Sequence, residues 1–284
     1  MLTIAITGAN SGIGLRAARR LAADGHHVLA LCRDAGRGRA AVADVNTRAP
    51  IPATFVRADL SDLDSVDAAA DEIINKVGRL DVLINNAAVF DQSMRKPAFT
   101  AQGHELFWAT NHLGPFLLTA RLSGLLAASP APRVINVASK GLVTMPRIRI
   151  RFDRLDDPGW YSPTRAYYHA KLAQIMTTFS LAERGRGRVD VACVRVPSVR
   201  LDPDRVAAMP RLLRTLYAPK NRVAVPPERL AETYARLAEG DAHGLYVDED
   251  LREVPAPAFA RDAAARERLW AESQAATGNP AWAW

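Results

Sequence analysis

Apolar runs alternate along the chain with segments in which apolar residues recur at helical spacing. Segments such as 17–22 and 66–77 have this spacing, which indicates helices. The apolar runs are rich in Val and Ile, and we expect strands at 2–7, 27–32, 54–57, 81–85, 133–137, 189–196 and 245–247. Because these runs show no polar alternation, both faces of the sheet should be buried, as in a parallel sheet covered by helices on each side. The pattern predicts an α/β fold with a doubly wound parallel sheet, the Rossmann fold, in three α/β/α layers.

Two irregular stretches, 141–162 and 198–227, interrupt this alternation. Strand and helix patterns resume after each of them, so we interpret both as loops rather than linkers within a single domain that spans 1–284. In such sheets, loops at the carboxyl ends of the strands form the ligand crevice, and we expect these two to enclose a substrate. The tail is expected to be helical over 262–277 and loose over 279–284.

Composition narrows the classes of function. With 49% hydrophobic and 24% charged residues, the chain is typical of globular proteins, and no apolar run approaches the length that a bilayer helix needs. The amino terminus shows no export signal, and the two cysteines, Cys32 and Cys193, suit a reducing compartment. We therefore expect a cytoplasmic protein without a membrane span.

Charge raises a question about partners. Thirty-seven basic against thirty acidic residues give a net charge of +7, carried mostly by arginine. Such a balance fits nucleic acid, a membrane surface or an anionic small molecule. The basic residues lack the clustering and aromatic interleaving of a nucleic-acid groove, so no nucleic-acid partner is expected.

A glycine-rich turn follows the first predicted strand. Residues 7–14 read Thr-Gly-Ala-Asn-Ser-Gly-Ile-Gly and lead into a helical segment. Gly8 permits the tight turn, Gly12 lets the backbone approach a diphosphate, and Gly14 allows close packing of helix on strand. An ordinary glycine turn is the alternative. At the start of a parallel α/β chain the pattern predicts an NAD(P)-binding site, which includes Gly8, Asn10, Ser11, Gly12, Ile13 and Gly14.

The end of the second strand indicates which cofactor is bound. The run 27–32 is followed by Arg33 and not by a carboxylate, and an arginine can bind a 2′-phosphate through paired donors. Asp34 is expected to cap the next helix. NADP(H) is therefore preferred over NAD(H), although a solvated surface arginine is the alternative for Arg33. Asp59, with Leu60 beside it, is the expected partner of the adenine amino group, or else a helix cap.

Tyr167 and Lys171 lie four positions apart in a segment that begins at Pro163 and has helical spacing, so they share one face of a helix. A tyrosine is a poor acid or base near neutrality because its usual pKa is about 10, and a neighbouring ammonium lowers that pKa by stabilising the phenolate. Ser139 ends the fifth strand, where its hydroxyl can donate to a carbonyl oxygen. A pair with this spacing is common by chance, but with Ser139 it predicts acid–base chemistry.

Polar residues elsewhere complete the predicted site. Asn111 lies inside a predicted long helix, where asparagine is unfavourable, and is either a buried structural residue or a water-mediated proton path to Lys171. Asn85, Asn86 and Ala87 end the fourth strand, and small residues there leave room for the ribose of the cofactor. We expect Asn85 and Ala87 to contact it.

Other candidates are weaker. His104, His112 and His169 have no partner at metal spacing, so we expect structural or surface roles and no metal site. An arginine-rich loop (Arg147, Arg149, Arg151 and Arg154) either attracts an anionic substrate or is simply exposed. Bulky residues in the two loops either line the substrate pocket or serve packing: Trp160, Tyr161, Leu212, Leu213 and Tyr217.

Taken together, these residues resemble the short-chain dehydrogenase/reductase family. The resemblance covers nearly the whole chain, because its motifs occur in order: 7–14, Asp59-Leu60, 85–87, Asn111, and Ser139 with Tyr167 and Lys171. Within the family the chain looks closest to the retinol-dehydrogenase-like branch, on segments 30–34, 111–119, 168–173 and 269–273. The resemblance implies hydride transfer between NADP(H) and a carbonyl or alcohol. Tyr167 would be the acid or base, Lys171 its pKa partner and ribose anchor, Ser139 the carbonyl polariser, and Asn111 the relay.

Two departures from the family pattern stand out. Ala88 replaces a usual glycine, and after the sixth strand 197–201 reads Pro-Ser-Val-Arg-Leu, where the family commonly has Pro-Gly and then a threonine that fixes the nicotinamide amide. Pro197 and Val199 can still cover the nicotinamide through their backbone.

We therefore predict an NADPH-dependent oxidoreductase that reduces a carbonyl on a hydrophobic substrate, or runs the reverse reaction. The alternatives are a non-redox enzyme of the same fold, catalysing cyclisation or dehydration, and a catalytically silent cofactor-binding sensor. Family members are often homodimers or homotetramers, so either assembly is compatible with the resemblance.

Overall fold

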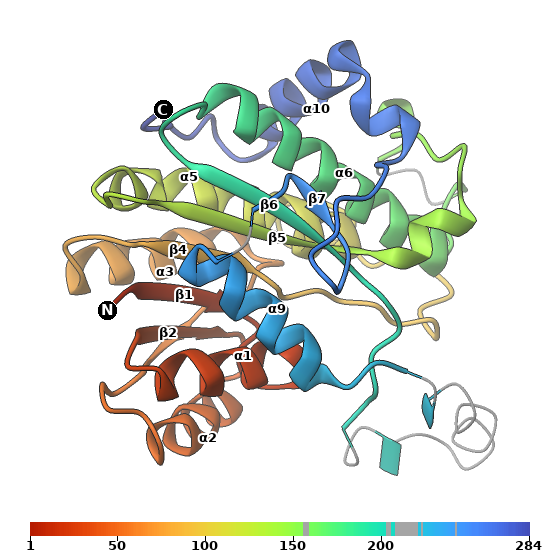
Figure 1. The fold of residues 1–284 in the computed structure, drawn as a ribbon. Helices are drawn as coiled ribbons and strands as arrows, with labels where there is room; N and C mark the ends of the chain where they lie inside the picture. The colour runs from red at the N-terminus through yellow and green to blue at the C-terminus, as the bar shows by residue number, and fades with distance from the viewer. Residues whose placement is uncertain (156–158, 203–205, 208–220, 223, 242) are drawn as a thin grey trace.

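One parallel sheet forms the centre of the molecule. The computed structural model describes residues 1–155, 159–202, 206–207, 221–222, 224–241 and 243–284. The strands are β1 (Thr3–Thr7), β2 (His27–Cys32), β3 (Thr54–Arg57), β4 (Val82–Asn85), β5 (Arg133–Ser139), β6 (Asp190–Val196) and β7 (Tyr246–Val247). They form a seven-stranded sheet in the order β3-β2-β1-β4-β5-β6-β7, and all neighbours are parallel (Figure 1). The predicted doubly wound α/β fold is confirmed.

Helices cover both faces of this sheet. On one face lie α1 (Gly12–Ala23), α2 (Ala35–Asn46) and α9 (Pro227–Glu239), with α1 and α9 side by side (Figure 1). On the other lie α3 (Leu63–Lys76), α5 (Gly114–Ala127) and α6 (Pro163–Arg184), with α10 (Ala263–Ala276) packed outside α6. Each face buries its own apolar core, which explains why the strands read as uninterrupted apolar runs.

The observed strands follow the predicted runs closely. The clearest difference is in β5, which extends beyond the predicted 133–137 because Ala138 and Ser139 pair with Arg195 and Val196 of β6. This pairing holds Ser139 in extended backbone at the carboxyl edge of the sheet.

The helical segment after β4 is interrupted in its middle. It consists of α4 (Leu106–Trp108), the π-helix η1 (Ala109–Leu113) and α5 in direct succession. Asn111, predicted inside a long helix, therefore lies in a π turn, a feature that often marks functional positions. The remaining short helices are the 3₁₀ turns η2 (Lys140–Thr144), η3 (Phe152–Arg154) and η4 (Ala258–Arg261).

The carboxyl terminus is docked, which corrects the expectation of a loose tail over 279–284. The indole of Trp282 donates to Gln274 Oε1 at 2.8 Å, and the amide of Ala283 donates to Ser123 Oγ on α5 at 3.0 Å. The rings of Trp282 and Phe116 lie 5.2 Å apart between centroids. Burial of the aromatic rings and these hydrogen bonds offset the entropy cost of ordering the chain end. The predicted helix over 262–277 is confirmed as α10, which Asp262 caps.

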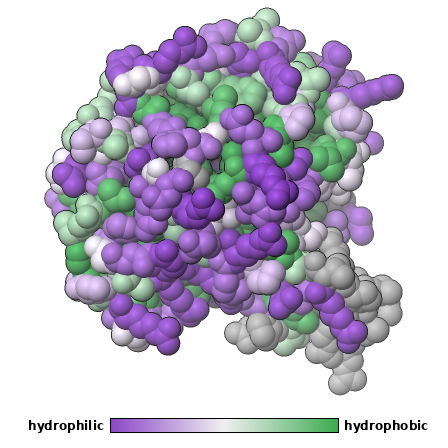
Figure 2. Space-filling view, viewed as in Figure 1, coloured by the Kyte–Doolittle hydropathy of each residue, from purple (hydrophilic) through white to green (hydrophobic). Residues whose placement is uncertain are grey.

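Most of the arginine charge described on the face formed by α1, α2 and α9 is balanced by acids. Arg16 approaches Glu228 at 3.3 Å, Arg20 approaches Glu232 at 3.0 Å, and Arg19 approaches Asp44 at 2.6 Å. Figure 2 shows that hydrophilic residues cover most of this face. The ion pairs account for much of the local positive charge without any external anion.

Within the described ranges, no helix is both long enough and apolar enough to cross a bilayer. The predicted loop residues Leu212, Leu213 and Tyr217 lie outside the described residues.

Candidate active site

The glycine turn joins β1 to α1 in a conformation that needs glycine. Gly8 and Gly12 have φ values of +68° and +56°, in the left-handed region that side chains disfavour. A Cβ on Gly14 would come within 2.4 Å of the Gly8 carbonyl oxygen, so only glycine lets α1 begin this close to β1. These glycines bring the first amides of α1 to the carboxyl edge of the sheet, where a helix N-terminus favours anions.

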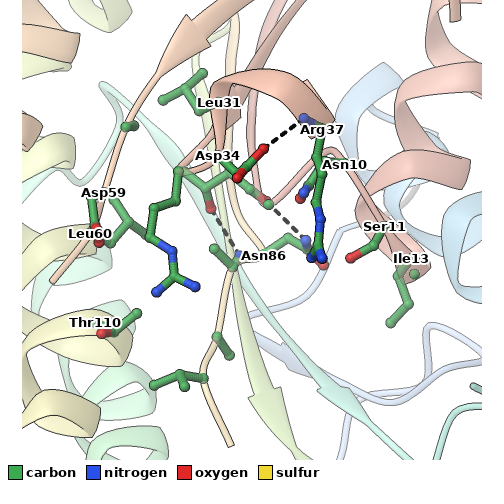
Figure 3. Close-up of a pocket in the computed structure, with 18 of the residues that line it drawn as sticks. Asn10, Ser11, Ile13, Leu31, Asp34, Arg37, Asp59, Leu60, Asn86 and Thr110 are labelled. Atoms are coloured by element: carbon green, nitrogen blue, oxygen red, sulfur yellow. Dashed lines mark hydrogen bonds between the residues drawn. The ribbon is translucent and has the colours of Figure 1, made fainter. Parts of the chain in front are cut away.

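A cavity of 410 Å³ opens beside this turn, at the carboxyl ends of β1, β2 and β4 (Figure 3). Most of the predicted cofactor residues line it: Gly8, Asn10, Ser11, Gly12, Ile13, Arg33, Asp59, Leu60 and Ala87. Its walls also include Arg37, Asn86, Val89 and Phe90, which we did not predict as cofactor contacts. The cavity lies where the strand order reverses between β1 and β4, the position at which open α/β sheets bind ligands.

Two exposed arginines line this cavity. Arg33 follows β2, and Arg37 lies on the first turn of α2, where its side chain approaches Asn10 (Figure 3). Asp34 caps α2 as predicted, because its carboxylate accepts a hydrogen bond from the Arg37 amide at 2.7 Å. Neither arginine has an ion-pair partner among the described residues. The sequence contained a signal for Arg37 as a cofactor contact: it lies three residues after the predicted helix cap Asp34 and so in the first turn of that helix.

The structure directs Asn85 away from the cavity. Its amide nitrogen donates to Asn136 Oδ1 at 2.9 Å and to Thr119 Oγ1 at 3.1 Å, and the side chain is buried between β4, β5 and α5. The neighbouring Asn86 lines the cavity instead and donates to the carbonyl oxygen of Thr7 at 2.9 Å. The expectation that Asn85 contacts the ribose through its side chain is therefore not supported, because successive side chains on a strand point to opposite faces.

Ser139, Tyr167 and Lys171 meet at the carboxyl edge of β5. Tyr167 and Lys171 lie on α6, whose N-terminus Ser162 caps by accepting from the Arg165 amide at 3.2 Å. Ser139 lies close enough to Tyr167 to lower the pKa of the phenol, and the Lys171 Nζ lies 5.9 Å from the centroid of the Tyr167 ring. Residues from β5 and from α6 thus converge as the sequence predicted.

The protonation of Tyr167 differs from the expectation. Burial raises the pKa of Tyr167 to about 12, and the neighbouring Ser139 hydroxyl only partly offsets this effect. Lys171 does not counter it, because its ammonium donates to the Val137 carbonyl at 2.6 Å and to Gln174 Oε1 at 2.9 Å. The expected lowering of the tyrosine pKa is therefore absent from this structure. Tyr167 retains its proton at neutral pH.

Lys171 itself is a buried cation with two fixed partners. It is 2% exposed, and burial lowers its pKa to about 8. One partner is a strand carbonyl and the other is Gln174, one turn further along α6. Gln174 was missed in the sequence because glutamine in a helix is unremarkable.

The Asn111 side chain binds the backbone of Val89, in the segment after β4. Its Oδ1 accepts from the Val89 amide at 2.8 Å, and its Nδ2 donates to the Val89 carbonyl at 2.9 Å. Both side-chain groups are therefore engaged by one residue of the cavity wall. These two hydrogen bonds give the Asn111 side chain a structural role, one of the two roles expected from the sequence. The water-mediated proton path to Lys171 stays a prediction.

The chain after β6 crosses toward the start of α1. Val199 bridges Val225, and the Arg200 amide donates to the Val225 carbonyl at 2.9 Å. Pro197 and Val199 do not line the cavity in this structure. Two residues beyond Arg200, the Asp202 carboxylate accepts from the Gly12 amide at 3.3 Å and pairs with Arg16 at 2.6 Å.

The remaining candidates are distributed around the site. His112 and His169 flank the Trp108 ring, with centroids at 4.5 and 5.1 Å, and burial lowers the pKa of each to about 3. Their structural role is confirmed. The described residues contain no group of three His, Cys, Asp or Glu side chains placed to hold a metal. Trp160 and Tyr161 line a small separate cavity, and Arg149 and Arg151 contact Phe259 and Asp153 rather than a common site.

Comparison with known proteins places the chain in a family. The family model described as short chain dehydrogenase matches residues 2–149. The chain belongs to the short chain dehydrogenase family. Human retinol dehydrogenase 12 is 36% identical over 271 residues, which cover 94% of this chain and 83% of that protein. The chain is an oxidoreductase of the retinol-dehydrogenase-like branch.

Solved structures agree with this assignment. The crystal structure of a protein from Mycobacterium paratuberculosis has a TM-score of 0.71 and 30% identity, covering 98% of this chain and 94% of that one. A metagenomic short-chain oxidoreductase in complex with NADP has a TM-score of 0.64 and 25% identity, covering 87% of this chain and 95% of that one.

Proposed function

We propose that the protein is an NADP(H)-dependent oxidoreductase that interconverts a carbonyl and an alcohol on a hydrophobic substrate. The observation that carries the proposal is the convergence of Ser139, Tyr167 and Lys171 at the same sheet edge as the glycine-turn cavity. The retinol dehydrogenases among its relatives support this class of reaction.

The cavity fits a phosphorylated dinucleotide. Gly8, Gly12 and the start of α1 would hold the diphosphate, and Asp59 with Leu60 would face the adenine. Arg33 and Arg37 would bind the 2′-phosphate, because both are exposed, both line the cavity and neither has an ion-pair partner in the part of the chain that the structure describes. Asp34 does not oppose this role, since its carboxylate is engaged in capping α2. The NADP complex of a related short-chain oxidoreductase supports the choice.

The chemistry of the chain's own residues favours reduction. When bound, the nicotinamide supplies the hydride. Ser139 donates a hydrogen bond to the carbonyl oxygen, and Tyr167 donates the proton that the oxygen takes up. Burial keeps the pKa of Tyr167 at about 12, so the phenol is protonated at neutral pH and ready to act as an acid. Lys171 lies on the same face of α6, with Nζ 5.9 Å from the centroid of the Tyr167 ring, so its charge would favour the phenolate once the proton has left if the ammonium turned from its present partners toward Tyr167.

The absorbance of NADPH, followed in the presence of a panel of ketones and aldehydes, tests the function. We expect NADPH consumption with at least one hydrophobic carbonyl, and we expect Tyr167→Phe to abolish it while leaving NADPH affinity nearly unchanged. Tyr168→Phe is the matched control, because the Tyr168 ring lies beside Tyr167, with 5.3 Å between centroids, but Tyr168 has no lysine four residues further along α6. Full turnover in Tyr167→Phe would refute the acid–base assignment. Substrate conversion without any NADPH consumption would favour the non-redox alternative, which the altered 197–201 segment motivates.

A further inference from the structure

An aromatic ring lies directly on the ring of the proposed acid. The centroids of Phe90 and Tyr167 are 4.4 Å apart and their planes are inclined by 35°. Phe90 is nevertheless 45% exposed, although its ring packs against the partly buried Tyr167. One side of the Phe90 ring is therefore in contact with Tyr167, while the rest faces open space.

The position of Phe90 is fixed by its neighbour along the chain. Asn111 holds both backbone polar groups of Val89, at 2.8 and 2.9 Å, so the chain that carries Phe90 is attached to the π turn of η1. Phe90 also lines the 410 Å³ cavity together with the glycine turn. Its ring thus lies where the cofactor cavity meets the acid, which is where a reacting carbonyl must be placed.

We propose that Phe90 is a specificity-determining residue, which favours flat, conjugated carbonyl substrates by stacking on them next to Tyr167. This inference rests on the proposed function and adds a substrate class to it. Aromatic rings attract other flat π systems in offset or tilted arrangements beyond the effect of buried area alone. A saturated ring of the same size presents axial hydrogens and cannot approach the Phe90 ring face as closely.

Phe90 has a second effect on the same site. Its ring covers part of Tyr167, and burial is the largest cause of the raised tyrosine pKa. Removal of the ring admits water to the phenol, so the pKa of Tyr167 should fall. Substrate selectivity and the pH profile of reduction should therefore change together in one variant.

The test compares two aldehydes that differ mainly in flatness, benzaldehyde and cyclohexanecarbaldehyde. The measured quantity is the ratio of their kcat/KM values, compared between variants so that intrinsic reactivity cancels. We expect Phe90→Ala to lower the preference for benzaldehyde by about three- to tenfold, mainly through a higher KM for benzaldehyde. Phe90→Tyr should retain the preference, because it keeps an aromatic ring.

Phe99→Ala is the matched control. Phe99 is 46% exposed and lies on the same connection between β4 and α4, but it lines the small cavity beside Trp160. We expect it to leave the aldehyde ratio unchanged. Equal losses for both aldehydes in Phe90→Ala, or an unchanged ratio, would overturn the inference. Wild-type protein that reduces neither aldehyde nor any other carbonyl would instead contradict the proposed function.

Discussion

The carboxylate of Asp202 accepts a hydrogen bond from the backbone amide of Gly12 at 3.3 Å. The same carboxylate pairs with Arg16 at 2.6 Å, so a side chain from the loop after β6 lies at the N-terminus of α1. This N-terminus is where the diphosphate of a dinucleotide is expected. The Asp202 carboxylate therefore lies where the cofactor diphosphate is expected to bind, and the two negative groups would compete for the Gly12 amide.

We expect Asp202→Asn to tighten NADPH binding by about three- to tenfold, because the diphosphate no longer competes with a charged group for Gly12. Fluorescence titration of NADPH measures the effect. Asp44→Asn is the control. Asp44 lies on α2 and pairs at 2.6 Å with Arg19, which is on α1 like Arg16, but it does not contact the glycine turn. Weaker binding in Asp202→Asn would show that Asp202 helps to hold the cofactor instead.

Arg33 and Arg37, which line the cavity, predict a selective effect on the phosphorylated cofactor. Replacement of Arg33 or Arg37 by Ala should weaken NADPH binding by about tenfold or more and leave NADH binding nearly unchanged, because each removes charge-assisted hydrogen bonds to the 2′-phosphate. Arg39→Ala provides the control, since Arg39 lies on α2 over the Phe55 ring at 5.7 Å. Equal losses for both cofactors would argue against a 2′-phosphate site.

The contact between Lys171 and Gln174 predicts a change in the pH profile. The pKa of Lys171 is lowered to about 8, so the lysine loses its charge, and reduction should slow, as the pH rises through that value. Gln174→Glu places a carboxylate at the 2.9 Å position of the amide oxygen, which favours the ammonium. We expect the alkaline limb of kcat to move upward by about one pH unit or more.

Gln174→Leu is the companion variant. It removes the acceptor without adding charge, so kcat should fall and the alkaline limb should not move upward. An identical pH profile in Gln174→Glu and wild type would show that Gln174 has only a packing role.

Two buried histidines predict acid-sensitive stability. His112 and His169 are neutral in the folded protein because burial lowers the pKa of each to about 3, and His169 Nε2 accepts from the Arg151 amide at 2.7 Å. In the unfolded chain histidine titrates near pH 6.5, so below that pH the unfolded state binds protons that the folded state does not. The free energy of unfolding should therefore be greatest above about pH 6.5 and fall as the pH drops.

Urea unfolding at about pH 7 and about pH 5 measures this loss, which can reach about 1.4 kcal/mol per pH unit for each histidine. His169→Gln keeps an acceptor for Arg151 and should flatten the dependence. If the free energy of unfolding of His169→Gln fell with pH as steeply as that of wild type, groups other than His169 would cause the acid sensitivity.

Much of this protein could be predicted from short stretches of sequence. The apolar runs predict a buried parallel sheet, the glycines at 8, 12 and 14 predict a turn that binds an anion, and the four-residue spacing of Tyr167 and Lys171 predicts a shared helix face. These features depend on backbone conformation and on neighbours within one or two turns. Such interactions are local, so they are visible in the order of residues.

Only the tertiary structure decided which side chains meet. Asp202 and Gly12 are 190 residues apart in the sequence, and Phe90 approaches Tyr167 from a different element. Burial raises the pKa of Tyr167 although its spacing from Lys171 predicted the opposite, since desolvation depends on everything packed around the ring. Asn85 turns into the core while Asn86 faces the cavity, and the tail docks through its tryptophans. The sequence determined the scaffold and its reactive residues, whereas long-range packing decided their partners, their protonation and the space in front of them.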